Sequence, residues 1–246
     1  MARRFFLNEK LAETMQISGT DAHHIVNVLR MKTGDEICVI DPMAQMAIVK
    51  ITSIYNEIIN VEMVQPLSEE REPNISVHLA QGLPKGDKFE YIVQKAVELG
   101  VTKILPLIMD ETVVKYDDAK KISRNKRWQA IAREAAKQSK RLAVPIVEQI
   151  QSIDELLNSI EPDVIVLALY EGNTKYGLKE ILNEHSNNKS FLLIIGPEGG
   201  FSSKEVNLLK EHDVILASLG SRILRTETAA VVAVSAVMYH YGEIGG

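Results

Sequence analysis

Two stretches in the second half of the chain, FLLIIGPEGGF (residues 191–201) and VILASLGSRILRTETAA (residues 214–230), carry most of the information about the fold. Each begins with a short apolar run, residues 191–195 and 214–219, which is typical of a buried strand. Each then passes through glycine into a segment that reads as a helix. Glycine at such a turn lets the backbone approach a ligand, and the helix N-terminus adds unpaired N–H donors. Two such turns after neighbouring parallel strands predict one ligand cleft at the carboxyl edge of the sheet.

Strands and helices alternate from residue 74 onward, which predicts a parallel sheet covered by helices on both faces. The runs expected as strands are residues 75–80, 103–108, 146–148, 164–169, 191–195 and 214–219. The segments expected as helices are residues 86–99, 123–139, 153–160, 178–185 and 203–211. A final helix is expected over residues 227–241, where Ala229 to Val234 leave no polar face for nearly two turns. A helix that is apolar all round is expected to be buried all round.

The first part of the chain has a different pattern. Short β-like runs at residues 4–7, 36–40, 47–55 and 58–64, with one helical insert from Asp21 as its N-cap to Leu29, predict a small β-barrel. Residues 65–73 are polar, charged and bounded by prolines, as expected of a linker. The sequence therefore predicts two domains, residues 1–70 and residues 74–246.

The charge of the chain is unevenly distributed. Its 246 residues carry a net charge of −5, but residues 115–141 hold ten basic residues against three acidic ones. That stretch has a net charge of +7 and the remainder −12, so a surface that binds phosphates is one interpretation and a solvated helix face is the other. The longest apolar runs are too short for a membrane span. The single cysteine, Cys38, suits a reducing compartment, so a cytoplasmic location is expected.

Several chemistries lack their motifs. The chain has no G-x-G-x-x-G fingerprint and no cluster of Cys and His residues at metal-ligand spacing, so neither a classical dinucleotide site nor a metal site is expected.

The motifs GPEGGFSxxE (from Gly196) and LGxRILRxETA (from Leu219) resemble those of the 16S ribosomal RNA uridine-N3 methyltransferases, a family of the SPOUT class. The stretch from His24 to Arg30 and the segment KGDK (residues 85–88) also fit, so the resemblance covers nearly the whole chain. It implies an N-terminal PUA-like RNA-binding domain, then a SPOUT domain with a trefoil knot through which the last helix passes. It further implies a homodimer that binds S-adenosylmethionine (SAM) and acts on 16S ribosomal RNA of the small subunit.

The resemblance and the loop chemistry together nominate site residues. Those expected to hold SAM are Leu169, Ile195, Gly196, Pro197, Glu198, Gly199, Gly200, Leu219, Gly220, Ile223, Leu224, Arg225, Thr228 and Ala229. The catalytic candidates are Arg225, Arg222 and Glu198, because an arginine beside a glycine turn can stabilise a developing anion and Glu198 is the acid of its loop. The residues expected to bind RNA are Arg30, Lys32, Lys121, Arg124, Arg127, Arg133, Lys137 and Arg141.

Two other functions remain open at this point. A ribose 2′-O methyltransferase of related fold would share the glycine loops, although the RILRTET run (residues 222–228) is closer to the N3 enzymes. A non-enzymatic RNA-binding assembly factor would explain the basic stretch and the barrel, but not the two glycine loops.

Overall fold

The computed structural model describes residues 4–172 and 174–245, which divide into two units. The first unit comprises residues 1–72 together with residues 137–143, and the second comprises residues 73–136 and 144–246. Residues 137–143 lie at the end of the basic stretch. Their place in the first unit depends on long-range packing that no local sequence pattern signals.

The first unit contains a five-stranded sheet of order β1-β3-β4-β5-β2, in which β1 pairs with β3 in parallel and the other pairs are antiparallel. Its elements are β1 (Arg4–Phe6), β2 (Thr14–Ile17), α1 (Gly19–His23), the π-helical turn η1 (His24–Val28), β3 (Glu36–Ile40), β4 (Met46–Tyr55) and β5 (Ile58–Leu67). One apolar core takes side chains from both edge strands, Phe5 from β1 and Ile17 from β2, and from the helical insert, Ile25. The sheet therefore wraps around one core.

Three details of the first unit differ from the sequence-based expectation. The strand β2 was not predicted, because four residues give too short a pattern. The N-cap of α1 is Ser18 and not Asp21, whose carboxylate instead pairs with Lys137. The expected linker is partly wrong, since Gln65 to Leu67 continue β5; Glu69 and Glu72, farther along, bind Arg4 and Arg141.

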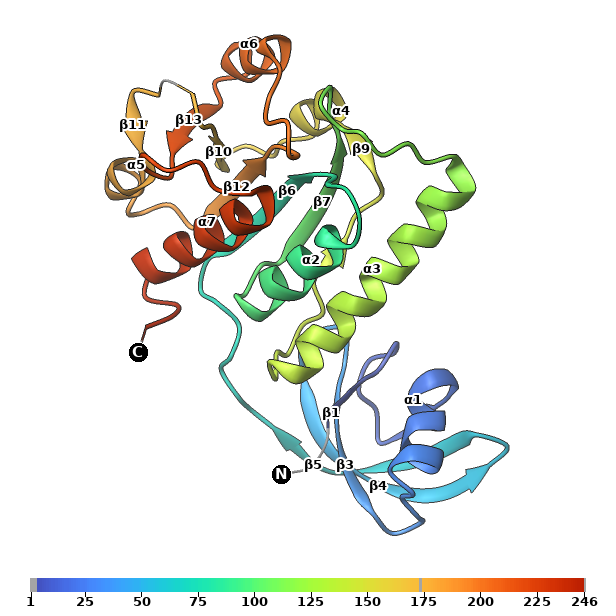
Figure 1. The fold of residues 1–246 in the computed structure, drawn as a ribbon. Coiled ribbons are helices and arrows are strands. Elements are labelled where there is room, and N and C mark those ends of the chain that lie inside the picture. The colour runs from blue at the N-terminus through green and yellow to red at the C-terminus, as the bar shows by residue number, and fades with distance from the viewer. Residues whose placement is uncertain (1–3, 173, 246) are drawn as a thin grey trace. The chain divides into compact units, whose positions relative to one another are not determined.

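The second unit is built on an eight-stranded parallel sheet of order β11-β13-β10-β12-β6-β7-β8, with β9 also paired to β7 (Figure 1). The strands are β6 (Ser76–Gly82), β7 (Lys103–Ile108), β8 (Ile146–Val147), β9 (Gln151–Ser152), β10 (Ile165–Leu169), β11 (Tyr176–Gly177), β12 (Ser190–Ile195) and β13 (Ile215–Ser218). The helices are α2 (Lys88–Glu98), α3 (Asp118–Gln138), α4 (Ile153–Asn158), α5 (Leu178–Glu184), α6 (Ser203–Glu211) and α7 (Thr226–His240). The alternating parallel fold is confirmed; the two-residue strands β9 and β11 were not predicted.

Helices cover both faces of this sheet. Side chains of α4 and α6, such as Leu156 and Leu209, pack with Leu192 and Ile194 of β12 in one core. On the other face α7 packs against α2, β6 and β12, and Phe191 of β12 lies 5.0 Å, centroid to centroid, from the ring of Tyr241. On α2 the buried residues Phe89, Ile92, Val93, Ala96 and Val97 form an apolar stripe, and Gly100 ends that helix at a φ of 101°. The trefoil knot stays a prediction.

The final helix is not buried all round. Ala230, Ala233, Val234, Val237 and Met238 face the core, whereas Val232 is 39% and Tyr239 69% exposed. The expectation of complete burial is therefore wrong for the single chain, and the strip of α7 that faces the exterior carries Val232 and Tyr239 together with Thr228.

Candidate active site

Four strands of the second unit end at one level along the carboxyl edge of the sheet. In the register of the sheet, Leu169 of β10 lies beside both Ala217 of β13 and Ile195 of β12, and Ile195 lies beside Gln81 of β6. The two motif loops follow β12 and β13. Because β10 lies between these strands, the expectation that they are neighbours is wrong. The turn after β10 therefore joins the two loops in forming the site.

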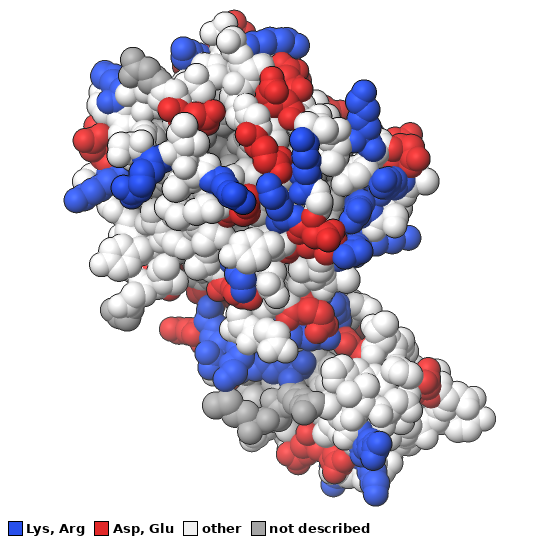
Figure 2. All heavy atoms as spheres, in the orientation of Figure 1, with Lys and Arg blue, Asp and Glu red and all other residues white. Residues whose placement is uncertain are grey.

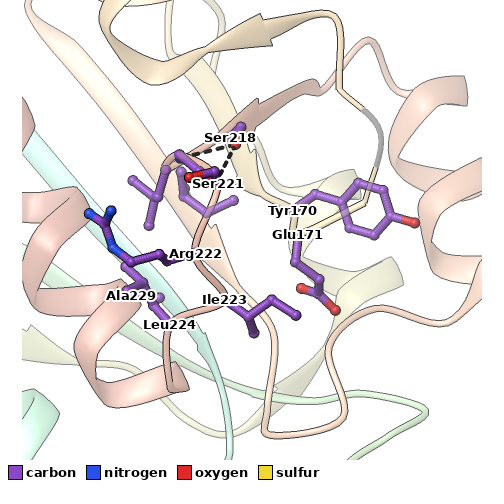
Figure 3. A pocket seen from close by; sticks show the side chains of 11 residues that line it. Tyr170, Glu171, Ser218, Ser221, Arg222, Ile223, Leu224 and Ala229 are labelled. Carbon is purple, nitrogen blue, oxygen red and sulfur yellow. Dashed lines mark hydrogen bonds between the residues drawn. The ribbon is translucent and has the colours of Figure 1, made fainter.

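Two adjoining pockets open at this edge. The larger has a volume of about 320 Å³ and the smaller about 70 Å³, and both are lined by Leu169, Glu171, Ile223, Leu224 and Ala229. Figure 3 shows the smaller pocket with Tyr170, Glu171 and the chain from Ser218 to Leu224 around it. Ile223, which lines both pockets, is 84% exposed.

Most residues nominated for the cofactor line these pockets. The larger takes Ile195, Gly196, Pro197, Glu198, Gly200 and Arg225, and the smaller takes Leu219, Gly220 and Arg222. Gly199 and Thr228 line neither: Gly199 packs against Glu111, and Thr228 is exposed on α7. The structure also adds six pocket residues that sequence analysis did not nominate: Lys88, Tyr170, Glu171, Ser218, Ser221 and Thr226.

The glycines of the first loop are required by close packing. A Cβ on Gly196 would lie 2.9 Å from the backbone carbon of Gly200, and a Cβ on Gly200 would lie 2.4 Å from Oε1 of Glu171. Gly200 also has a φ of 72°, and its N–H donates to the carbonyl oxygen of Pro197 at 3.0 Å. The loop therefore folds back on itself and meets the turn after β10.

Thr226 is not the N-cap of α7; that position belongs to Arg225. The buried Thr226 hydroxyl instead donates to the carbonyl oxygen of Gly196 at 2.6 Å and accepts from Nε2 of Gln81 at 2.8 Å. Gln81 Nε2 also donates to the carbonyl oxygen of Gly82 at 2.8 Å. This network joins the end of β6, the first glycine loop and the start of α7 beneath the larger pocket.

Glu198 is engaged by the start of α2. Its Oε1 accepts hydrogen bonds from Nζ of Lys88 at 2.8 Å and from the backbone N–H of Lys85 at 3.1 Å. Burial raises the pKa of Glu198, but the hydrogen bonds from Lys88 and the backbone outweigh it, so the pKa lies below its ordinary value. A carboxylate held in this way is a poor general base at neutral pH. The geometry therefore favours a bracing role for Glu198.

Arg222 and Arg225 extend from the second loop. Both are exposed, and within residues 4–172 and 174–245 neither guanidinium has an ion-pair partner or a side-chain hydrogen bond. Arg225 lines the larger pocket and Arg222 the smaller. Both guanidinium groups are therefore available to an anionic group in the site.

The basic stretch of the second unit is partly neutralised. Arg124 and Arg127 of α3 both bind Glu90 of α2, at 3.3 and 2.7 Å, and Lys121 binds Asp118 at 3.2 Å. Arg133, also on α3, is half-buried. Figure 2 shows basic and acidic side chains intermingled over α3. The surface open to phosphates is thus weaker than the count of basic residues implies.

The RNA-binding candidates of the first unit separate into two groups. Arg30 and Lys32 are exposed. Lys137 instead binds Asp21 at 2.7 Å, and Arg141 is 5% exposed and binds Glu72. The expectation that Arg141 faces RNA is therefore not met, because its guanidinium is buried within the first unit.

No group of three metal-type side chains is close enough to hold an ion among the described residues. None of the helices in the described ranges combines the length and the apolar character that crossing a membrane requires.

Comparison with known proteins places this site in a family. Residues 70–238 match the RNA methyltransferase domain, and residues 17–61 match the RNA methyltransferase PUA domain. The chain is 39% identical to ribosomal RNA small subunit methyltransferase E of Bacillus subtilis over 93% of its length and 91% of that protein. It is 32% identical to the protein of the same name from Mesomycoplasma hyopneumoniae, covering 93% and 95% of the two chains.

Solved structures agree. The crystal structure of ribosomal RNA small subunit methyltransferase E from Neisseria gonorrhoeae bound to S-adenosylmethionine superposes with a TM-score of 0.87 at 29% identity, over 97% of this chain and 98% of that one. A putative methyltransferase of Legionella pneumophila in complex with SAM gives a TM-score of 0.86 at 28% identity, with the same coverage. The resemblance seen in the motifs is confirmed: this chain belongs to the RNA methyltransferase family, as a relative of the ribosomal RNA small subunit methyltransferases E.

Proposed function

We propose that this protein transfers a methyl group from SAM to N3 of a uridine in the 16S ribosomal RNA of the small subunit. The observation that carries the proposal is the larger pocket, in which residues of both motif loops meet at the carboxyl ends of β10 and β12. The relatives that the chain matches over more than nine-tenths of its length carry the name of this enzyme class.

The pocket fits SAM chemically. Leu169, Ile195, Leu224 and Ala229 offer an apolar wall for a neutral purine, and the glycine loop allows close backbone contact. Glu171 and Glu198 are acidic residues in the lining of the pocket. Their carboxylates would repel a nucleotide phosphate and suit a ligand with cationic groups. When bound there, SAM supplies a methyl carbon on a sulfonium, which is already a good leaving group.

The state of the nucleophile determines what the protein must supply for methyl transfer. Uracil N3 carries a proton at neutral pH, and attack requires that this proton be lost and that the resulting negative charge be stabilised. Arg225 has a guanidinium with no ion-pair partner among the described residues at the larger pocket, so it is suited to bind a uracil oxygen as charge develops. Arg222, at the smaller pocket, is suited to anchor the RNA. Lys88 and Glu198 brace the loop that positions the base and the methyl donor.

The alternatives fit less well. A non-enzymatic assembly factor has no use for a 320 Å³ pocket lined by both motifs. A ribose 2′-O methyltransferase of related fold would share the glycine loops, but the RILRTET run (residues 222–228) and the names of the relatives favour the ribosomal RNA N3 enzymes.

The protein is proposed to act in the cytoplasm as a homodimer. The exposed strip of α7, with Val232 and Tyr239, is the surface on which a second copy would pack. RNA would be held by Arg30 and Lys32 of the first unit and by the basic residues of α3 in the second.

The test is an in vitro reaction. Purified protein is incubated with SAM and small ribosomal subunits, or deproteinised 16S ribosomal RNA, from cells that lack the gene. Digested nucleosides are then analysed by mass spectrometry. The expected product is 3-methyluridine. Appearance of 2′-O-methyluridine would favour the related ribose enzymes, and absence of any methylated nucleoside on either substrate would contradict the proposal.

A further inference from the structure

Glu171 occupies the centre of the site. It comes two residues after the end of β10, between the loops that follow β12 and β13, and it lines both pockets. Its carboxylate lies against Gly200, since Oε1 would be 2.4 Å from a Cβ at that glycine. In Figure 3 its carboxylate points toward the side of the pocket formed by Ile223, while the Tyr170 ring points away from it.

Tyr170, the residue before Glu171, is anchored by its backbone and by its ring. The N–H of Tyr170 donates to the carbonyl oxygen of Ala217 at 3.0 Å, and its ring meets Phe201 edge to face at 6.3 Å. Gly172 leaves room for that ring, because a Cβ there would lie 2.4 Å from it. These contacts anchor the backbone that leads into Glu171.

Glu171 also differs in charge balance from the other acid of the pocket. Glu198 is paired with Lys88 at 2.8 Å. Glu171 has no ion pair or side-chain hydrogen bond within residues 4–172 and 174–245. Its negative charge is thus available to a ligand at a point where the carboxylate adjoins Gly200 of the glycine loop.

We propose that Glu171 is a specificity residue that favours the cationic methyl donor over the neutral product. This inference rests on the proposed function. SAM and S-adenosylhomocysteine share adenine, ribose and amino-acid groups, and they differ in the methyl group and the positive charge on sulfur. Apolar walls and backbone groups contact the shared parts and discriminate little, whereas a carboxylate near the sulfur attracts only the donor. Methyl transfer removes that attraction, so the product leaves more readily.

The experiment is calorimetric titration of the intact protein with three ligands. They are SAM, S-adenosylhomocysteine and sinefungin, in which a carbon bearing an ammonium replaces the methylated sulfur and keeps the positive charge. The variant is Glu171→Gln. The matched control is Glu111→Gln, because Glu111 packs against Gly199 of the same loop without lining either pocket.

In Glu171→Gln the affinities for SAM and sinefungin are expected to fall by about 3- to 10-fold, as for loss of a partly exposed charge pair, with the affinity for S-adenosylhomocysteine unchanged. Equal losses for all three ligands would overturn the inference, since Glu171 would then bind a group they share. No loss for any ligand would overturn it as well. Failure of the unmodified protein to bind SAM would instead remove the proposed function, and this inference with it.

Discussion

The hydroxyl of Thr226 donates a 2.6 Å hydrogen bond to the carbonyl oxygen of Gly196, so that the first residue of α7 fixes the glycine loop after β12. The same hydroxyl accepts from Gln81, and both groups are buried. The floor of the larger pocket is thus held by a side chain that does not belong to the loop itself.

Replacing Thr226 by valine should loosen this floor. The substitution keeps the shape but removes the 2.6 Å donor of the buried Gly196 carbonyl and one of the acceptors of Gln81 Nε2, which costs about 1–3 kcal/mol of unfolding free energy. SAM affinity should fall with it. Thr226→Ser retains the hydroxyl and is expected to restore most of both quantities, measured by denaturant unfolding and calorimetry. Equal SAM affinity in the valine and serine variants would show that the hydrogen bonds of Thr226 do not contribute to SAM binding.

Filling the pocket should block SAM. Ala229 is half-buried and lines both pockets, so Ala229→Phe is expected to abolish measurable binding while α7 stays folded. Thr228→Phe is the matched control, because Thr228 is exposed on the same helix and lines neither pocket. Gly220 is less suited to this test, since its φ of 114° would strain any side chain placed there. Similar affinities in the two phenylalanine variants would show that the site lies elsewhere.

Arg225→Ala should slow methyl transfer far more than it weakens SAM binding. If its guanidinium stabilises negative charge on uracil, that interaction is strongest in the transition state, and removing one such donor typically costs about 10²- to 10³-fold in rate. Single-turnover assays at saturating SAM and RNA measure this rate, with Arg222→Ala for comparison. Near-normal turnover of Arg225→Ala under saturation would reduce its role to anchoring RNA.

Glu90 restrains two arginines that RNA would otherwise reach. Glu90→Gln should free Arg124 and Arg127, raise RNA affinity at low salt and steepen the fall of log affinity with log salt, by about 0.7 to 0.9 for each additional phosphate that the protein neutralises. Glu98→Gln is the control, since Glu98 lies on the same helix and pairs with Lys95. Filter-binding titrations at several salt concentrations give both slopes. Identical slopes in the two variants would exclude this part of α3 from the RNA surface.

The exposed strip of α7 should control oligomeric state. Tyr239→Asp would place a charge on that strip and is expected to convert a dimer into a monomer, as measured by sedimentation equilibrium. Tyr55→Asp serves as the control because Tyr55 is comparably exposed but lies in the first unit. A dimer that persists in Tyr239→Asp, or a monomeric unmodified protein, would contradict packing through this strip.

Local patterns predicted the elements and not their neighbours. The apolar runs and the glycines around Ile195 and Gly220 were enough to predict parallel strands and two ligand loops, because periodicity and turn chemistry act within a few residues. The order of strands in a sheet is set by long-range packing. The sequence therefore could not place β10 between β12 and β13, and Glu171 was missed although it follows a correctly predicted strand.

For the charged residues too, the local sequence predicted the composition but not the long-range partners. Composition identified the basic stretch, but the pairing of Arg127 with Glu90 and of Arg141 with Glu72 joins residues 37 and 69 positions apart. Threonine at a helix start usually caps the helix, but the hydroxyl of Thr226 binds Gly196 and Gln81, and Gln81 is 145 positions away. Such long-range partners are not visible in a local pattern.

The network around Thr226 also determines how a bound ligand would act on the whole chain. The pocket above it is lined by the loops after β10, β12 and β13 and by α7, and the hydrogen bond from Gln81 to Thr226, 145 positions apart, ties β6 to that lining. A bound molecule that contacts all of these segments stabilises their native arrangement, as a reversible cross-link between them would. Its binding energy should therefore slow amide hydrogen exchange in β6 and α7 together, far along the backbone from one another, rather than in a single loop.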